Sequence, residues 1–117
     1  MKNSQIIKAY NTLETLSAKK IPDKTQWYIF QLRKSLLPHV EFFNERVETL
    51  KDKYRPFADN QGNLTGEKST EFAQEIDDLN NMEKELEINK FTLELTGETG
   101  ITALEMEILD SFIDFMF

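Results

Sequence analysis

The chain has 117 residues, of which 39% are hydrophobic and 30% are charged, no cysteine, and a net charge of −7. This length and composition predict one globular domain, residues 1–117, and exclude a disulfide framework, thiolate metal sites and a cysteine nucleophile. The N-terminal residues lack the long apolar segment of a secretory signal, and no apolar run reaches the length of a membrane span. We therefore expect a cytoplasmic protein that does not enter the membrane.

The charge is unevenly distributed along the chain. Residues 1–66 hold 11 Lys and Arg against 7 Asp and Glu, whereas residues 67–117 hold 3 against 14. Two interpretations stay open: basic and acidic helix faces pair within the fold, or an acidic surface meets a basic partner. Direct binding of nucleic acid is not expected, because the sequence has no dense basic patch with interleaved aromatic residues.

A first amphipathic helix is expected over residues 4–18. Its apolar side chains recur at helical spacing: Ile6, Ile7, Tyr10, Leu13 and Leu16. The Ile21-Pro22 pair that follows disfavours helical geometry at Ile21, so this helix should end before it.

A second, long helix is expected over residues 23–54. Asp23 stands three residues before Gln26, which is a capping pattern at the start of a helix. The apolar seam of this helix consists of Tyr28, Leu32, Leu36, Val40, Phe43, Val47, Leu50 and Tyr54. Pro38 lies inside the seam and predicts a kink or break near residues 35–38.

A third helix is expected over residues 67–84, after the polar loop ADNQGNLTG, which is the best reversal point in the chain. One face of this helix carries Phe72, Ile76, Leu79 and Met82. Because the connecting loop is short, the second and third helices should lie antiparallel as a coiled-coil-like hairpin. The fold class expected is therefore mainly α.

Residues 85–95 interrupt the helical pattern with a β element. Leu86 and Ile88 alternate in one phase, whereas Phe91, Leu93 and Leu95 alternate in the opposite phase. A β-hairpin with its turn at Asn89-Lys90 accounts for this change and pairs Ile88 with Phe91. A single strand with a bulge at the same two residues is the alternative, since lysine is a poor residue for the second turn position.

A last helix is expected over residues 102–116. Thr102 and Glu105 have the spacing of a capping box, and apolar residues continue to the C-terminus. The final residues, FIDFMF, are too apolar to lie in water without a partner surface.

No catalytic or cofactor motif is present. The single histidine, His39, lies in the long helix, and the sequence has no nucleophile elbow, phosphate loop or dinucleotide fingerprint. A carboxylate metal bundle needs histidines that the chain lacks, and the loop that faintly resembles a calcium site has Leu64 and Thr70 at its critical positions. We therefore expect no enzyme activity, no cofactor and no metal.

Taken in order, several segments resemble small helical proteins of unknown function encoded by phages and prophages of Gram-positive bacteria. They are IIKAYNTLETLSAKKIPDKTQWYIFQLRKSL, LKDKY, DNQGN, FAQEIDDLNNMEKELEINKFTLEL and ITALEMEILDSFI. The resemblance covers nearly the whole chain and consists of apolar spacing and turn placement. It implies a phage origin, a non-enzymatic role, and a place in the host cytoplasm or in the virion.

These observations lead to two hypotheses for function. The first is a structural or assembly component that forms homo-oligomers or docks on a phage or host protein. The alternative is an acidic inhibitor of a host nuclease or defence protein, which rests on the charge of residues 67–117. The protein interface is expected at the β element and the apolar end: Leu86, Ile88, Phe91, Leu93, Leu95, Phe112, Phe115 and Phe117.

Overall fold

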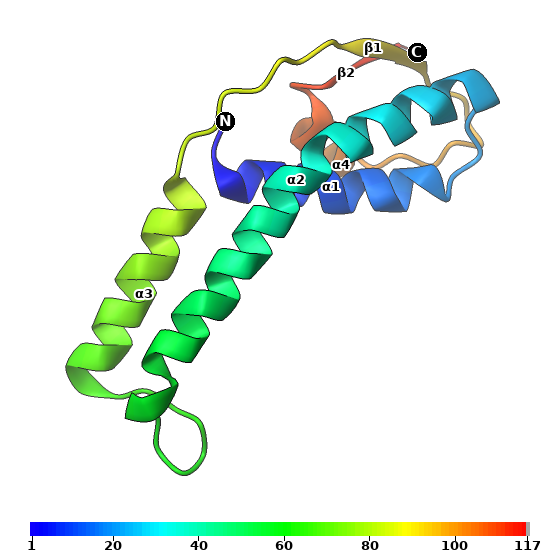
Figure 1. Cartoon of the computed structure of the whole chain (residues 1–117). Helices are drawn as coiled ribbons and strands as arrows, with labels where there is room; N and C mark the ends of the chain where they lie inside the picture. The colour runs from blue at the N-terminus through cyan, green and yellow to red at the C-terminus, as the bar shows by residue number, and fades with distance from the viewer. Residues whose placement is uncertain (117) are drawn as a thin grey trace.

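The computed structural model describes residues 1–116 as an elongated molecule of 52 × 28 × 19 Å (Figure 1). The helical elements within these residues are α1 (Asn3–Ser17), α2 (Asp23–Tyr54), the 3-10 turn η1 (Arg55–Phe57), α3 (Gly66–Asn81) and α4 (Ala103–Leu109). Two strands complete the fold, β1 (Phe91–Glu94) and β2 (Ile113–Met116). The expectation of a mainly helical protein with a small β element is confirmed.

The side chain of Gln26, which was expected to cap α2, instead holds the turn between α1 and α2. Pro22 precedes α2, and no side chain caps this helix. Gln26 instead reaches back, and its Nε2 donates to the carbonyl oxygens of Ser17 and Lys19 at 3.2 and 3.3 Å. The predicted bounds of both helices agree with the structure within one residue. The capping role expected for Asp23 and Gln26 is wrong.

α2 runs through Pro38 without interruption, so the predicted break is wrong. A proline inside a helix removes one backbone donor and leaves the carbonyl four residues earlier without its partner. Pro38 and Lys34 are both exposed, so water can hydrate the carbonyl that the proline leaves unpaired. The helix tolerates the proline because it lies on the solvent side.

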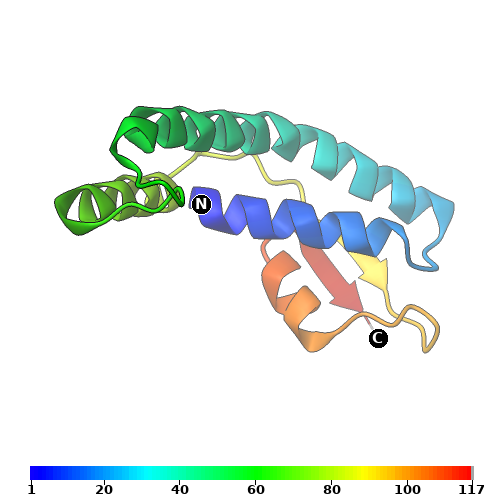
Figure 2. The ribbon, with the colours of Figure 1, turned by 90° about the horizontal axis from the view of Figure 1, so that it is seen from below.

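α1 lies at the centre of the hydrophobic core, between α2 and the C-terminal elements (Figure 2). The buried side chains of this core are Ile6, Ala9, Leu13, Leu16, Ile29, Leu36, Val40, Leu93, Leu109, Phe112 and Ile113. Full burial of a large apolar side chain stabilises a fold by about 1.5–3 kcal/mol. The C-terminal elements are therefore an integral part of the folded core.

The C-terminal half of α2 extends from this core together with α3 (Figure 1). Lys53 Nζ lies 2.9 Å from Glu75 Oε1, and the rings of Tyr54 and Phe72 meet edge to face at 5.4 Å. Both contacts join α2 to α3, and Tyr54 is buried between them. The two helices thus form a thin arm that has far fewer buried side chains than the core.

α3 ends three residues before its predicted end, because the following residues bind the N-terminal segment instead. Asn3 N–H donates to Met82 O at 3.0 Å, and Lys84 N–H donates to Met1 O at 2.8 Å. The buried side chain of Asn3 also donates to Leu79 O at 2.9 Å. These bonds tie the start of α1 to the end of the arm.

The β element is a parallel pair and not a hairpin. β1 pairs with β2 so that Phe91 lies opposite Ile113 and Leu93 lies opposite Phe115. Residues 85–90, which were expected to form the first strand, contain no strand residue. Both the hairpin and the single bulged strand are therefore wrong.

The local backbone explains why no hairpin forms at Asn89-Lys90. The tight hairpin turn expected there requires a positive φ at its central residues. Within residues 1–116 positive φ values occur only at glycines 62, 66 and 100. Without a glycine at Asn89 or Lys90, the chain passes through these positions in extended form and pairs with a distant segment.

The predicted helix over 102–116 is also wrong in its second half. The capping box that starts it is confirmed: Thr102 Oγ1 accepts from Glu105 N–H at 3.1 Å, and Glu105 Oε1 accepts from Thr102 N–H at 3.0 Å. α4 nevertheless ends at Leu109, and β2 follows. Phenylalanine and isoleucine favour strands, and a short apolar run fits either periodicity. α4 thus supplies the crossover that parallel strands require.

Candidate functional site

The predicted interface residues divide between the core and its margin. Leu93 and Phe112 are each only 1% exposed and belong to the core. The other predicted residues that the structure describes are partly buried and pack against the core: Leu86, Ile88, Phe91, Leu95 and Phe115. Phe117 lies outside the described residues. The side chains of this set mainly pack within the hydrophobic core or against it. A partner protein that binds beside the sheet would therefore also need to contact other groups.

The backbone of β1 provides such groups. Leu95 N–H donates to Met116 O at 2.6 Å, which together with the register fixes which residues of β1 point toward β2. In a parallel ladder alternate residues make both bonds to the neighbour, here Phe91, Leu93 and Leu95. The N–H and C=O groups of Thr92 and Glu94 therefore point away from β2. Within residues 1–116 no backbone partner from another element reaches them.

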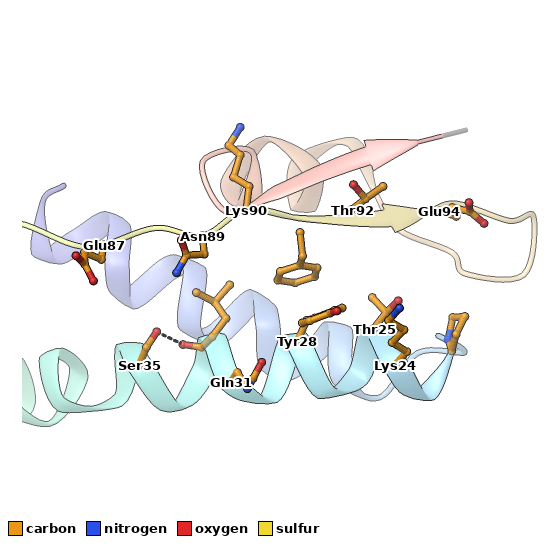
Figure 3. A pocket seen from close by; sticks show the side chains of 13 residues that line it. Lys24, Thr25, Tyr28, Gln31, Ser35, Glu87, Asn89, Lys90, Thr92 and Glu94 are labelled. Atoms are coloured by element: carbon orange, nitrogen blue, oxygen red, sulfur yellow. Dashed lines mark hydrogen bonds between the residues drawn. The ribbon is translucent and has the colours of Figure 1, made fainter.

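An open groove of about 800 Å³ lies between this free edge and α2 (Figure 3). One wall is the chain from Glu87 to Glu94, and the other is formed by Pro22 and by α2 as far as Ser35. Figure 3 shows Thr25 and Tyr28 rising from α2 toward β1, which places α2 beneath the space where a neighbouring strand would lie. The groove therefore combines unpaired backbone groups with a side-chain floor.

Two aromatic rings close the middle of the groove. The rings of Tyr28 and Phe91 stack with centroids 5.6 Å apart and planes inclined by 26°. Tyr28 is 37% exposed, and Leu32 lines the groove one turn further along α2. An apolar side chain that entered here would find a rigid, partly desolvated surface.

The charges of the groove are only partly neutralised. Lys90 Nζ lies 3.5 Å from Asp114 Oδ1 across the sheet. Glu87 and Glu94 line the two ends of the same wall and form no ion pair within residues 1–116. Lys24 lies at the Glu94 end in Figure 3, whereas no unpaired basic side chain of residues 1–116 lines the Glu87 end. The Glu87 end thus carries an uncompensated negative charge.

A second, smaller groove of about 430 Å³ lies along the other strand. Met106 and Phe115 supply its apolar surface, and Glu107, Asp110 and Asp114 give it a negative charge. It adjoins β2, so both strands of the sheet have a hollow beside them.

No cluster of three or more potential metal ligands occurs in the part of the chain that the structure describes. The pKa of the Glu105 carboxyl lies below its usual 4.5, chiefly because the backbone N–H of Thr102 donates to it, with Lys19 nearby at 3.7 Å. This shift belongs to the helix cap.

The interface predicted from the sequence includes one residue that lines the groove, Phe91, but none of the α2 residues on its other side. Tyr28 was assigned to the seam between long helices, and Thr92 was not considered. The available signal was the polar phase of the strand, Thr92 and Glu94, which the structure shows to be exposed.

Comparison with protein-family models, with curated proteins and with solved structures finds no match. No helix among residues 1–116 combines the length and apolarity that a membrane crossing needs. The fold and the groove define a mainly helical protein with a two-stranded parallel sheet and a free strand edge.

Proposed function

We propose that this chain is a non-enzymatic phage or prophage protein that acts through protein-protein contacts, as an assembly component in the host cytoplasm or the virion. The resemblance of its segments to small phage proteins supports the origin. The groove beside a free strand edge supports the mode of action. The protein binds other proteins and associates with itself.

The observation that carries this proposal is the incompleteness of the sheet. Parallel sheets are normally covered on both faces, and an isolated two-stranded sheet is marginally stable in water. Here one face packs on the core, while the other face carries exposed side chains: Thr92, Glu94, Asp114 and Met116. A sheet with bare edges and one bare face is a surface for another polypeptide.

Self-association has its own support on the outer side of α2. Trp27 and Phe30 stack at 5.4 Å, yet they are 57% and 51% exposed. Leu37 follows one heptad after Phe30 and is 37% exposed. An exposed aromatic and aliphatic stripe of this kind is typical of a helix that packs against a second helix. We propose that this stripe joins copies of the chain, and that α2 and α3 form an antiparallel coiled-coil-like hairpin.

Sedimentation velocity over a range of micromolar concentrations tests self-association. The sedimentation coefficient of the wild-type protein should rise with concentration, and the double variant Trp27→Glu, Phe30→Glu should remain monomeric. Phe57→Glu is the matched control, because Phe57 is 54% exposed but lies outside the stripe. A monomer at every concentration, together with no phage or host protein recovered from producing cells, would contradict the proposed function.

A second candidate is the acidic inhibitor of a host nuclease or defence protein. It is favoured by the exposed acidic side chains that form no ion pair within residues 1–116: Glu67, Asp77, Asp78, Glu85, Glu87, Glu94, Glu98, Glu107 and Asp110. Only two ion pairs between side chains, Lys19–Glu105 and Lys53–Glu75, join the basic and acidic parts of the chain. Binding of a basic host partner that weakens steeply with salt would favour this candidate.

A further inference from the structure

We propose that the groove between α2 and β1 binds one extended segment of a partner protein, which adds a third strand to the sheet at the edge formed by Thr92 and Glu94. The inference rests on the proposed protein-binding function and names the chemistry of the partner. The segment has apolar side chains at alternate positions and a basic side chain at the Glu87 end. Four features of the groove support it.

The first feature is the set of unused backbone groups. The N–H and C=O groups of Thr92 and Glu94 point into the groove, since the ladder to β2 uses the residues between and beside them. A strand placed about 4.8 Å away can accept and donate bonds at both residues. Main-chain pairing of this kind provides affinity in many peptide-binding domains.

The second feature is the floor. A strand beside β1 needs something beneath it, because its inward side chains must leave water. α2 provides this surface with Tyr28, which points toward β1 in Figure 3, and with Leu32. The ring of Phe91 stacks on Tyr28 and continues the surface to the sheet. Side chains at alternate positions of the segment point down onto these residues, which is why they are apolar.

The third feature is charge. Glu87 has no ion-pair partner within residues 1–116, and the neighbouring Lys90 pairs with Asp114. Lys24 lies at the opposite end of the groove, near Glu94. A Lys or Arg at one end of the segment therefore fits beside Glu87.

The fourth feature argues against a second copy of β1 as the occupant. β1 is flanked by α2 on its free edge, so β1 of another copy would bring its own α2 to the same place. The two helices would compete for the space beneath the paired strands. A segment without a flanking helix enters without this conflict.

The substitution Thr92→Pro tests the backbone contact. Proline removes the N–H that points into the groove, while the bonds from β1 to β2 involve other residues. Thr92→Val is the matched control, since it changes the side chain and retains the N–H. Circular dichroism and thermal unfolding establish that both variants fold.

The probe is a library of short linear peptides of random sequence, displayed and selected on the intact protein. We expect enriched peptides with alternating apolar residues and a terminal basic residue. These peptides should bind the Thr92→Val variant with the affinity of wild type, and their affinity for the Thr92→Pro variant should be lower by at least about tenfold. N-methylation of alternate peptide amides should cause a similar loss, and this readout does not depend on any variant.

Several outcomes would overturn the inference. One is that the selection enriches no peptide, and another is that the enriched peptides bind the Thr92→Pro variant as tightly as wild type. Enriched sequences that copy β1 or β2 of this chain would indicate that a second copy occupies the groove. Failure of these tests leaves the sedimentation results on the Trp27 and Phe30 stripe unaffected. The inference and the proposed function can therefore fail separately.

Discussion

Truncation of Phe112 probes whether the end of the chain belongs to the core. Phe112 is the largest fully buried side chain among residues 1–116 and is 1% exposed. A Phe→Ala change at a buried site costs about 3–5 kcal/mol, and a domain of this size has a total stability of roughly 6–18 kcal/mol. At about 4 °C per kcal/mol, the melting temperature should fall by roughly 12–20 °C.

Urea unfolding followed by circular dichroism measures this loss, with Phe57→Ala as the surface control. Phe57 is 54% exposed and contacts Lys68 at its ring face, so its truncation should cost less than about 1 kcal/mol. Phe112→Leu offers a milder change if the alanine variant does not fold. Equal losses for Phe112→Ala and Phe57→Ala would refute the placement of β2 and the residue before it in the core.

Two further predictions concern hydrogen bonds at helix ends. The lowered pKa of Glu105 means that its carboxylate contributes stability above pH 4.5, and this stability is lost as the pH falls through the lower folded-state pKa. Glu105→Gln should therefore lower the free energy of unfolding by about 0.5–1 kcal/mol at pH 7 but not at strongly acidic pH. The substitution Glu107→Gln, at an exposed residue, is the control. Asn3→Ala removes the donor to Leu79 O and should lower the free energy of unfolding by about 1–3 kcal/mol, whereas an unchanged value would contradict the role of Asn3 in joining α1 to α3.

The helices could be predicted from the sequence because their signals are local. The long seam from Tyr28 to Tyr54 repeats over many turns, so a single proline did not obscure it. The capping box of Thr102 and Glu105 is a pattern of only four residues, and it forms as expected. Local periodicity and local capping need no knowledge of the rest of the chain.

The strand pairing could not be predicted, because it depends on residues far apart in the chain. The alternation around Phe91 and Leu93 indicated a strand but not its partner. The partner, from Ile113 to Met116, also fits a helical pattern, and its pairing with β1 and the burial of Ile113 in the core favour the strand. A parallel pair of strands also requires a crossover connection between them. The sequence pattern extended the last helix to residue 116 and left no strand after it, whereas α4 ends at Leu109 and serves as the crossover.

The interface predicted from the sequence and the groove seen in the structure share the β1 segment but differ in the groups they use. The excess of apolar residues near the C-terminus indicated a contact region, and the structure shows that most of these side chains pack within the chain. The groups left for a partner are backbone amides and the face of Tyr28. The polar phase of Thr92 and Glu94 indicates an exposed face of the strand, but residue identity does not show that the backbone groups of these residues lack a neighbouring strand.

Hydrogen exchange of the β1 amides, measured by NMR on the protein with and without a selected peptide, tests the central claim most directly. In the free protein the amides of Leu93 and Leu95 should be protected by β2, while those of Thr92 and Glu94 exchange rapidly. The bound peptide should slow exchange at Thr92 and Glu94. Equal protection of all four amides in the free protein, or no change at Thr92 and Glu94 on binding, would contradict the claim that this edge is open and receives a partner strand.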